Sequence, residues 1–453
     1  MPKKKTALTI EERLQQALVP AEEQPYEVPE NWVWVRLGAI AEIVTGGTPS
    51  KKHPEYYGGN FPFYKPSDLD QGRLTYDASE YLSEEGKNVS RIIPKNSTAV
   101  CCIGSIGKCG YLMCEGTTNQ QINSAIPKIN SLCLYYYLCT ENFVQDLLSM
   151  ASATTIAIVN KSKMESCAFP LPPLSEQQRI VERIEELFAK LDEAKERLQE
   201  VADSFAVRKA AILHKAFTGE LTKQWRWENG VSYESWEEKK GEDFFEYVTS
   251  GSRGWAKYYS DKGSIFIRMG NLNHGTIELD FSDIQYVELP DQVEGQRSKL
   301  QKNDILISIT ADVGMIALVR EDMDAYINQH VALARPKNDL YAEFLAWYFV
   351  SDDGLQQMQN KQRGATKIGL GLQDIRSIIL KIPTLPEQHE IVRLIDDLLA
   401  RERAAQQAAE QALASIDLMK KSILARAFRG ELGTNKASEA SALELLKQVL
   451  AEN

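Results

Sequence analysis

The chain has 453 residues and a net charge of −11, and 43% of its residues are hydrophobic while 25% are charged. This balance is typical of globular proteins and excludes a disordered or fibrous chain, and the length suggests about three domains. The apolar stretches fall far short of the ~20 residues that a membrane span needs. The residues after Met1 are basic and then amphipathic, without the apolar core of a secretory signal, so we expect a cytoplasmic protein.

An internal repeat defines the organisation of the chain. The segment LSEQQRIV at 174–181 recurs as LPEQHEIV at 385–392, and AFTGEL at 216–221 recurs as AFRGEL at 427–432, each 211 residues later. A helix cannot gain or lose a residue without turning its apolar face by ~100°. The constant offset therefore predicts two helices of equal length, each following a more variable globular half.

Six segments are expected in chain order. They are an N-terminal tail or helix (1–24), a first globular domain (25–173), a central helix (174–221), a second globular domain (222–384), a distal helix (385–432) and a C-terminal tail or helix (433–453). The last segment is amphipathic, and it is either a docking element or a frayed end.

Both globular halves predict a mixed α/β domain. Short β-type runs (99–103 and 305–309) alternate with turn residues, and α-rich stretches follow (132–150 and 340–358). The sequence contains no H-E-x-x-H, no G-x-S-x-G and no methyltransferase motif, and the stretch 104–108 lacks the glycine spacing of a phosphate loop. We therefore expect no catalytic residue in this chain.

The seven cysteines all lie between Cys101 and Cys167, and no pair has the C-x-x-C spacing of zinc or redox motifs. The repeat places Ser308, Ile309 and Ile316 opposite three of them, so a site common to both halves does not use them. We expect reduced thiols that fill the core, and no metal site.

The two helical segments carry a heptad pattern, in which apolar residues recur at alternating steps of four and three. Ser175 with Gln178 predicts a capping box at the first helix, and Gly219 and Gly430 predict the helix ends. The second pattern is interrupted by Glu402 and is rich in alanine, and large residues opposite small ones favour packing of the two helices against each other. If a near two-fold axis relates the two like units, the paired helices run antiparallel. The alternative is that each helix packs only on its own domain. The residues expected to pair are Ile180, Ile184, Leu187, Leu191, Leu198, Ile391, Ile395, Leu398, Ala405, Ala409, Ala412 and Ile416.

Polar loops recur at matching places in the two halves, which favours a shared binding role over ordinary solvated turns. Short polar side chains with Arg, Asn and Gln among them suit contacts to phosphates and base edges. The candidate DNA-binding residues of the first half are Gly47, Thr48, Ser50, Lys51, Lys52, Lys65, Ser67, Asp68, Gln120, Gln121, Thr154 and Thr155. Those of the second half are Ser250, Arg253, Arg268, Asn271, Gln329, His330, Arg363, Thr366 and Lys367.

The repeated L-x-E-Q-x-x-I-V and A-F-x-G-E-L motifs, with PYEVPENW at 25–32, closely resemble the specificity subunit of type I restriction–modification enzymes of the enterobacterial type. The resemblance covers nearly the whole chain. It implies two α/β target-recognition domains separated by two antiparallel helices, with each domain reading one half of a split, asymmetric DNA target. It also implies that the helices set the unread gap and dock the partner subunits.

The resemblance further implies which partners and cofactors act with the chain. Two modification subunits would use S-adenosylmethionine to methylate adenine, and two restriction subunits would use ATP and Mg²⁺ for translocation and cleavage. The chain itself would bind no cofactor and would not be an enzyme.

The acidic net charge is unusual for a DNA-binding chain, because non-specific affinity comes from neutralised phosphates. We expect basic modification subunits to supply most of that attraction. The competing interpretations are a two-headed small-molecule enzyme, a fused methyltransferase–nuclease and a coiled-coil scaffold that does not read DNA. The first two lack the necessary motifs, and the third does not need two elaborate domains.

Overall fold

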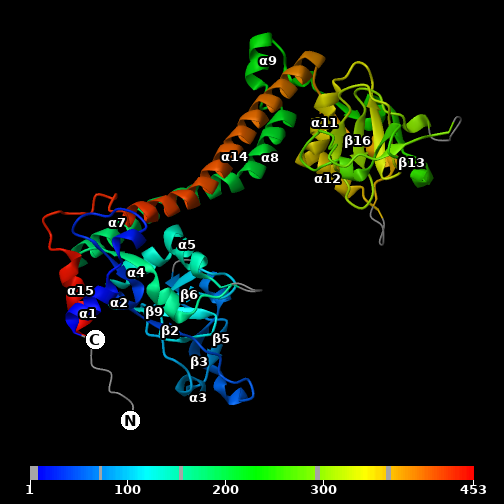
Figure 1. Cartoon of the computed structure of the whole chain (residues 1–453). Coiled ribbons are helices and arrows are strands. Elements are labelled where there is room, and N and C mark those ends of the chain that lie inside the picture. Colours follow the sequence, from blue (N-terminus) through cyan, green and yellow to red (C-terminus); the bar gives the residue numbers. More distant parts are fainter. Residues whose placement is uncertain (1–8, 71–73, 153–156, 291–295, 364–368, 453) are drawn as a thin grey trace. The chain divides into compact units, whose positions relative to one another are not determined.

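The computed structural model describes residues 9–70, 74–152, 157–290, 296–363 and 369–452 (Figure 1). The chain divides into two compact units, and the first is discontinuous in sequence. Unit 1 comprises Met1–Leu198 with Gln411–Asn453, and unit 2 comprises Gln199–Glu410. Both units contain helices and sheets, as the mixed α/β prediction requires.

Unit 1 is built on a five-stranded sheet with strand order β2-β9-β6-β7-β4, a three-stranded sheet with order β5-β3-β8, and the pair β1-β10. The strands are β1 (Val33–Arg36), β2 (Ala41–Thr45), β3 (Tyr57–Tyr64), β4 (Leu74–Thr75), β5 (Glu80–Leu82), β6 (Thr98–Cys101), β7 (Cys109–Leu112), β8 (Thr117–Thr118), β9 (Ile122–Pro127) and β10 (Ala168–Leu171). The helices before the repeat motif are α1 (Ile10–Ala17), α2 (Leu37–Ile40), α3 (Glu84–Asn88), α4 (Ser131–Leu138), α5 (Glu141–Met150) and α6 (Lys161–Ser166).

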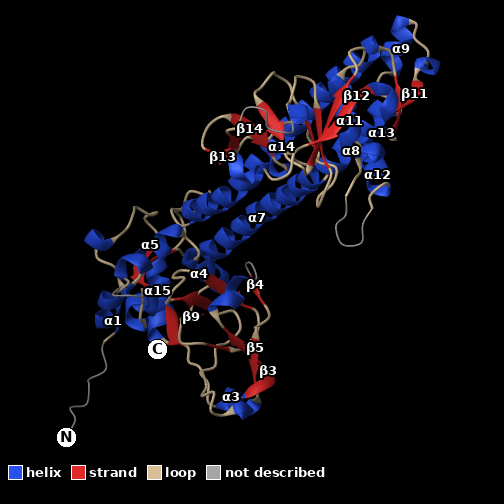
Figure 2. Cartoon of the chain, turned by 90° about the vertical axis from the view of Figure 1, so that its right-hand side faces the viewer, coloured by secondary structure: helices blue, strands red, loops and turns tan. Residues whose placement is uncertain are grey.

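Unit 2 repeats this topology. Its four-stranded sheet has the order β12-β19-β16-β17, which matches β2-β9-β6-β7, and the parallel pair β14-β18 matches β3-β8. The strands are β11 (Glu237–Lys240), β12 (Phe245–Ser250), β13 (Tyr259–Ser260), β14 (Ser264–Ile267), β15 (Tyr286–Val287), β16 (Ile305–Ser308), β17 (Ile316–Leu318), β18 (Ala325–Ile327), β19 (Val331–Pro336) and β20 (Ile379–Ile382). The helices are α9 (Lys223–Asn229), α10 (Gly241–Phe244), α11 (Ala342–Val350), α12 (Asp352–Asn360) and α13 (Leu372–Arg376), and α11 contacts β17 beside the sheet (Figure 2).

The first repeat motif forms two helices rather than the single helix predicted for 174–221. Helix α7 (Leu174–Asp203) is interrupted at Ser204, and α8 (Phe205–Phe217) follows. The Ser204 hydroxyl donates to the Val201 carbonyl at 2.7 Å, a back-bond of the kind that bends helices. The chain leaves α8 through Gly219, whose φ of 78° is the left-handed conformation expected of the predicted stop.

The second repeat motif forms one continuous helix, α14 (Leu385–Ala427), which ends five residues before the predicted limit of 432. Gly430, with φ of 75°, follows the end of the helix, as predicted. The predicted capping box at the first motif is wrong, because Ser175 lies inside α7 and the Gln178 amide donates to Glu182 at 3.1 Å instead.

Each unit contains its own antiparallel contact between the helices. In unit 2, Arg208 of α8 pairs with Glu402 of α14 at 2.8 Å, and the Thr222 hydroxyl beyond α8 donates to Glu387 at the start of α14 at 2.7 Å. In unit 1, Lys420 of α14 pairs with Asp192 of α7 at 2.5 Å. Nearer the start of α7, Arg179 contacts Thr434, which follows the end of α14. In each unit the residue number therefore falls along one helix as it rises along the other, so the helices run in opposite directions.

The residues predicted to pair are buried to different degrees. Ile180, Ile184, Ile391, Ile395, Ala409 and Ile416 are buried, and Leu187, Leu191, Leu198, Leu398 and Ala412 are half-buried. Ala405 is exposed, so its place in the predicted seam is wrong. In this part of unit 2, the Arg208 and Glu402 side chains form an ion pair between α8 and α14.

The C-terminal segment is folded against the beginning of the chain. Helix α15 (Ala442–Ala451) contacts α1 and α2, and the Ala442 amide donates to the Asn31 carbonyl at 2.9 Å. Leu446 is fully buried in the same core cluster as Trp32 and Leu37. The frayed end that the sequence left open is therefore excluded, because this segment supplies part of the core of unit 1.

Candidate nucleic-acid interface

In unit 1, backbone hydrogen bonds bring three of the predicted polar loops to one end of the sheets. The Gly47 amide donates to the Thr118 carbonyl at 2.8 Å, and the Thr48 hydroxyl donates to the Gln120 side-chain oxygen at 2.6 Å. The Asn119 amide donates to the Tyr64 carbonyl at 3.1 Å, which places the loop that begins at Lys65 alongside. Segments separated by more than fifty residues in the sequence therefore form one polar edge.

Unit 2 assembles the equivalent loops in the same way. Ser252 forms a bridge with Asn328, and the Asn328 amide donates to the Ile267 carbonyl at 3.0 Å, next to Arg268. The Ile309 amide donates to the His330 carbonyl at 2.9 Å, and the following Thr310 bridges to Gly369, which itself pairs with Arg363. The fourth predicted loop therefore adjoins the other three through its described flanks.

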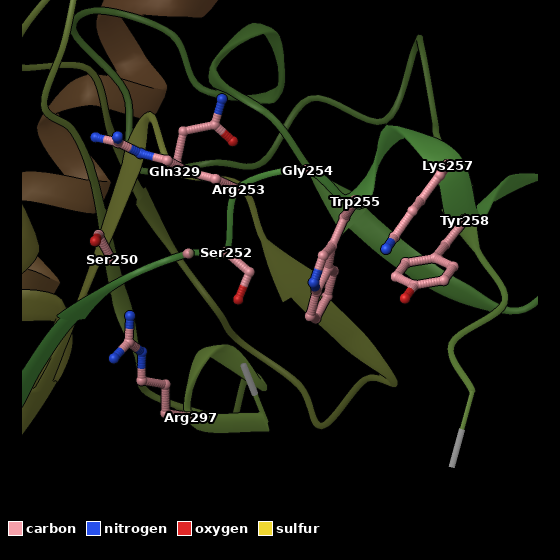
Figure 3. A pocket seen from close by; sticks show the side chains of 10 residues that line it. Ser250, Ser252, Arg253, Gly254, Trp255, Lys257, Tyr258, Arg297 and Gln329 are labelled. Atoms are coloured by element: carbon pink, nitrogen blue, oxygen red, sulfur yellow. The ribbon is translucent and has the colours of Figure 1, made fainter. Parts of the chain in front are cut away.

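The polar edge of unit 2 encloses a pocket of about 890 Å³ (Figure 3). The predicted residues Ser250, Arg253 and Gln329 line it, and Figure 3 shows Arg253 and Gln329 on one side and Arg297 on the other, with Ser252 between them. Three cationic side chains with hydroxyl and amide groups between them suit phosphate and base contacts. Arg253, Lys257 and Arg297 supply the positive charge.

Sequence reasoning missed part of this pocket. Lys257, Arg297, Trp255 and Tyr258 also line it, yet none of them was predicted. The selection required polar loop residues that recur at matching places in both halves, and these four residues did not meet that criterion. The Trp255–Tyr258 turn, which starts after Gly254 with φ of 76°, positions Lys257 and Tyr258. Aromatic residues beside Arg and Lys were the available signal.

Two predicted DNA contacts are wrong, because the structure buries them as turn anchors. Asp68 is 4% exposed and accepts the amides of Lys65 at 2.7 Å and Ser79 at 3.0 Å. Asn271 is 3% exposed, accepts the Arg268 amide at 2.9 Å and donates to the carbonyls of residues 280 and 283. Asp and Asn fold back on their own turns as readily as they meet a ligand, so the sequence alone did not distinguish the two roles.

The remaining candidates differ in how freely they face solvent. Lys65, Arg268 and Arg363 form ion pairs with Glu80, Asp283 and Asp374 at 2.7, 2.8 and 3.0 Å. The His330 ring lies within hydrogen-bond distance of Thr310 and Gln329, and Gln121 is held by Asn119. The exposed candidates are Gly47, Thr48, Ser50, Lys51, Lys52, Ser67, Gln120, Arg253, His330 and Arg363. Thr154, Thr155, Thr366 and Lys367 lie outside the described residues.

The cysteines are free thiols, and the backbone amide of Cys102 donates to the carbonyl of Gln121 at 2.7 Å. Cys101, Cys102, Cys133 and Cys167 are buried, and burial raises the pKa of Cys102 to about 12. Within the described ranges, no group of His, Cys, Asp or Glu side chains has the arrangement of a metal site. The helices seen in those ranges also include none with the length and apolar character of a membrane span.

The chain as a whole matches one protein family. A profile of the type I restriction modification DNA specificity domain matches residues 29–203 and again 233–412. The chain therefore belongs to this family and contains two copies of its domain. Its role is DNA specificity rather than catalysis.

Similar proteins cover nearly the full length. The chain is 28% identical to the type I restriction enzyme EcoBI specificity subunit of Escherichia coli, over 94% of this chain and 93% of that protein. It is 24% identical to the EcoKI specificity subunit of Escherichia coli strain K12, over 94% and 96%. The crystal structure of the HsdS subunit from Thermoanaerobacter tengcongensis has the same fold, with a TM-score of 0.64 and 19% identity over 90% of this chain and 99% of that one.

Proposed function

We propose that residues 25–173 and 222–384 are two target-recognition domains, each of which reads one half of a split target in double-stranded DNA. The observation that carries this proposal is the recurrence of the polar edge. The same loops converge in both units, but their side chains differ: Thr48 and Gln121 of unit 1 correspond to Ser252 and His330 of unit 2. Different side chains on a shared frame favour two unlike half-sites, and so an asymmetric target.

The helices α7, α8 and α14 set the unread gap between the two halves and provide the surface on which partner subunits dock. Two modification subunits methylate adenine with S-adenosylmethionine, and two restriction subunits translocate and cleave DNA with ATP and Mg²⁺. Partner subunits also account for the acidic charge of −11, because they supply cationic surface that this chain lacks overall. The assembly works in the cytoplasm, where the chromosome is accessible.

A domain exchange tests the proposal. The complex of this chain with the modification subunit of its own system is incubated with a pool of randomised duplexes, and the methylated sequences are read out. Replacing residues 30–170 by the same segment of another specificity subunit should change one half of the selected target and leave the other half and the gap unchanged. A change in both halves, or in neither, would contradict the assignment of one half-site to each domain.

A scaffold that does not read DNA is the alternative function, and the same assay separates it from the proposal. A scaffold would support methylation without sequence preference or would not support it at all. Binding by the isolated chain provides a second test. We expect weak binding without the modification subunit at 150 mM salt, where surface attraction is strongly screened, and tight specific binding by the chain alone would contradict the role given to the partners.

A further inference from the structure

The two repeat motifs each bury one glutamate at the start of a helix. Glu176 of α7 and Glu387 of α14 are both fully buried, and they are separated by the repeat offset of 211 residues. A buried carboxylate is costly unless several donors surround it, so each must be held by specific partners.

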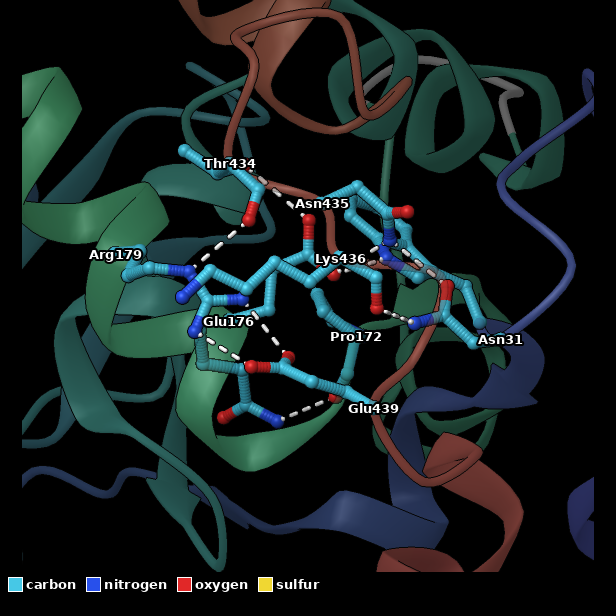
Figure 4. A network of polar contacts seen from close by, with 10 residues as sticks. Asn31, Pro172, Glu176, Arg179, Thr434, Asn435, Lys436 and Glu439 are labelled. Carbon is cyan, nitrogen blue, oxygen red and sulfur yellow. Dashed lines mark hydrogen bonds and ion pairs between the residues drawn. The ribbon is translucent and has the colours of Figure 1, made fainter.

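In unit 1, the donors to Glu176 come from two distant parts of the chain (Figure 4). The Trp32 indole, at the entrance to the first domain, donates to it at 2.7 Å. The Thr434 hydroxyl and the Asn435 amide, which follow the end of α14, donate at 3.2 and 2.8 Å. Arg179 of α7 fastens the same segment through the Thr434 carbonyl at 3.0 Å and a two-pronged ion pair with Glu439.

In unit 2, Glu387 is held by equivalent parts of the chain. The Trp236 indole, at the entrance to the second domain, donates at 3.0 Å. The Thr222 hydroxyl and the Arg226 guanidinium, which follow the end of α8, donate at 2.7 and 2.6 Å. Arg226 is itself 8% exposed and also donates to the Gly219 carbonyl, so it cannot move freely to another partner.

Both sites therefore have the same design. A glutamate in the first turn of one helix is bound by the segment that leaves the other helix, and a tryptophan completes the shell. The apolar seam alone specifies the helix register weakly, because a heptad pattern matches itself after a shift and α14 contributes small alanines at Ala409 and Ala412. A buried polar group penalises every shifted register, because the shift separates the charge from its donors.

We propose that Glu176 and Glu387 are register locks: each one fixes the position at which the segment leaving one helix meets the start of the other helix. By fixing the helix register, the two glutamates make the assembled complex select a single gap length between the half-sites. This inference rests on the proposed function, in which the helices set the gap. A shift of one helical turn moves a helix by about 5.4 Å, against a rise of about 3.4 Å for each base pair. Loss of a lock should therefore admit gaps that differ by one or two base pairs.

The test measures methylation by the complex of the full chain with its modification subunit. The substrates are duplexes with both native half-sites and gaps that are native, or one or two base pairs longer or shorter. Glu176→Gln and Glu387→Gln keep the side-chain volume but remove the charge and one acceptor oxygen. Each should lower the preference for the native gap about tenfold or more, since hydrogen bonds to charged groups are worth at least a factor of ten, with half-site preference unchanged. Glu186→Gln is the matched control, because Glu186 of α7 is exposed and forms surface ion pairs with Arg183 and Lys190 of the same helix.

The milder variants Trp32→Phe and Trp236→Phe keep an aromatic ring in the core but remove the indole donor and part of the ring volume. They test the proposal if the glutamine variants do not assemble. They should give a smaller loss of gap preference in the same direction. The proposed role of the two glutamates would be contradicted if the variants of Glu176, Glu387, Trp32 and Trp236 assembled but kept the native gap preference. It would also be contradicted if these variants changed the half-site preference instead. Equal methylation of all gap lengths by the unmodified complex would contradict the proposed function itself, and this outcome is distinct from a failure of the lock alone.

Discussion

The substitution Leu446→Ala tests whether the C-terminal helix is part of the unit that contains the first domain. Leu446 lies in α15, is fully buried, and shares a core cluster with Trp32 and Leu37 near the start of the chain. Truncation of a fully buried leucine to alanine costs about 2–5 kcal/mol, because apolar contacts are lost and a cavity remains. We take about 3 kcal/mol as the expected loss in the free energy of unfolding of unit 1.

This loss converts into a measurable shift of the unfolding midpoint. For a unit of about 240 residues, each kcal/mol lowers Tm by about 2–4 °C, so unit 1 should unfold about 6–12 °C earlier. Brief proteolysis at a series of temperatures, followed by mass spectrometry of the fragments, assigns a midpoint to each unit. Peptides from residues 9–70 report on unit 1, and peptides from 245–290 report on unit 2.

The control for this experiment is Leu418→Ala in α14. Leu418 is 66% exposed, so its truncation should change the stability of unit 1 by no more than about 0.5 kcal/mol. The reasoning would be refuted if Leu446→Ala left the midpoint of residues 9–70 unchanged. It would also be refuted if the midpoint of residues 245–290 fell by the same amount.

Three further predictions concern the pocket and the thiols. Arg253→Ala should weaken DNA binding by the complex and reduce the slope of log affinity against log salt concentration by about one. The control is Lys262→Ala, which changes an exposed lysine outside the pocket and should leave the slope unchanged. An unchanged slope for Arg253→Ala would show that Arg253 does not contact DNA phosphate. Alkylation at pH 8 should modify the exposed Cys114 well before the buried Cys133, and mass spectrometry showing the opposite order would contradict the burial. Burial raises the pKa of Cys102 to about 12 and raises the pKa of Cys133 well above its ordinary range. Because the folded unit 1 favours protonated thiols, their contribution to its stability is complete below about pH 8.5, the pKa of an unfolded cysteine, and is lost as pH rises towards the folded-state pKa values. A thermal midpoint for residues 9–70 that stays constant from pH 8 to 10.5 would refute this prediction.

The repeat made much of the fold predictable from the sequence. The constant offset between the two L-x-E-Q motifs predicted two similar α/β domains and two helix segments, and the matching strand orders agree with it. The break at Ser204 was not predictable from the sequence, because a serine inside a helix can either face solvent or hydrogen-bond to a preceding backbone carbonyl, as Ser204 does to Val201. The place of α15 was missed for a different reason: an amphipathic pattern gives a buried face but not the partner that buries it.

The polar edge was predicted in part. Recurrence in both halves selected loops that the structure brings together, but it also selected Asp68 and Asn271, which hold their own turns. The same criterion passed over Arg297 and Lys257, which line the pocket of unit 2. If the two domains read different bases, the side chains that contact those bases should differ between the domains. A search for residues shared by both halves therefore finds the loops that form the polar edge more readily than the side chains that contact bases.

Genome-wide mapping of methylated adenine tests the central claim most directly. Single-molecule sequencing is applied to cells that express this chain with the modification subunit of its system, and to cells that express the modification subunit alone. We predict one asymmetric motif made of two unlike halves with a fixed gap, with one methylated adenine in each half on opposite strands, and no motif in the second strain. Methylation of a continuous or symmetric motif, or a motif that does not depend on this chain, would contradict the account.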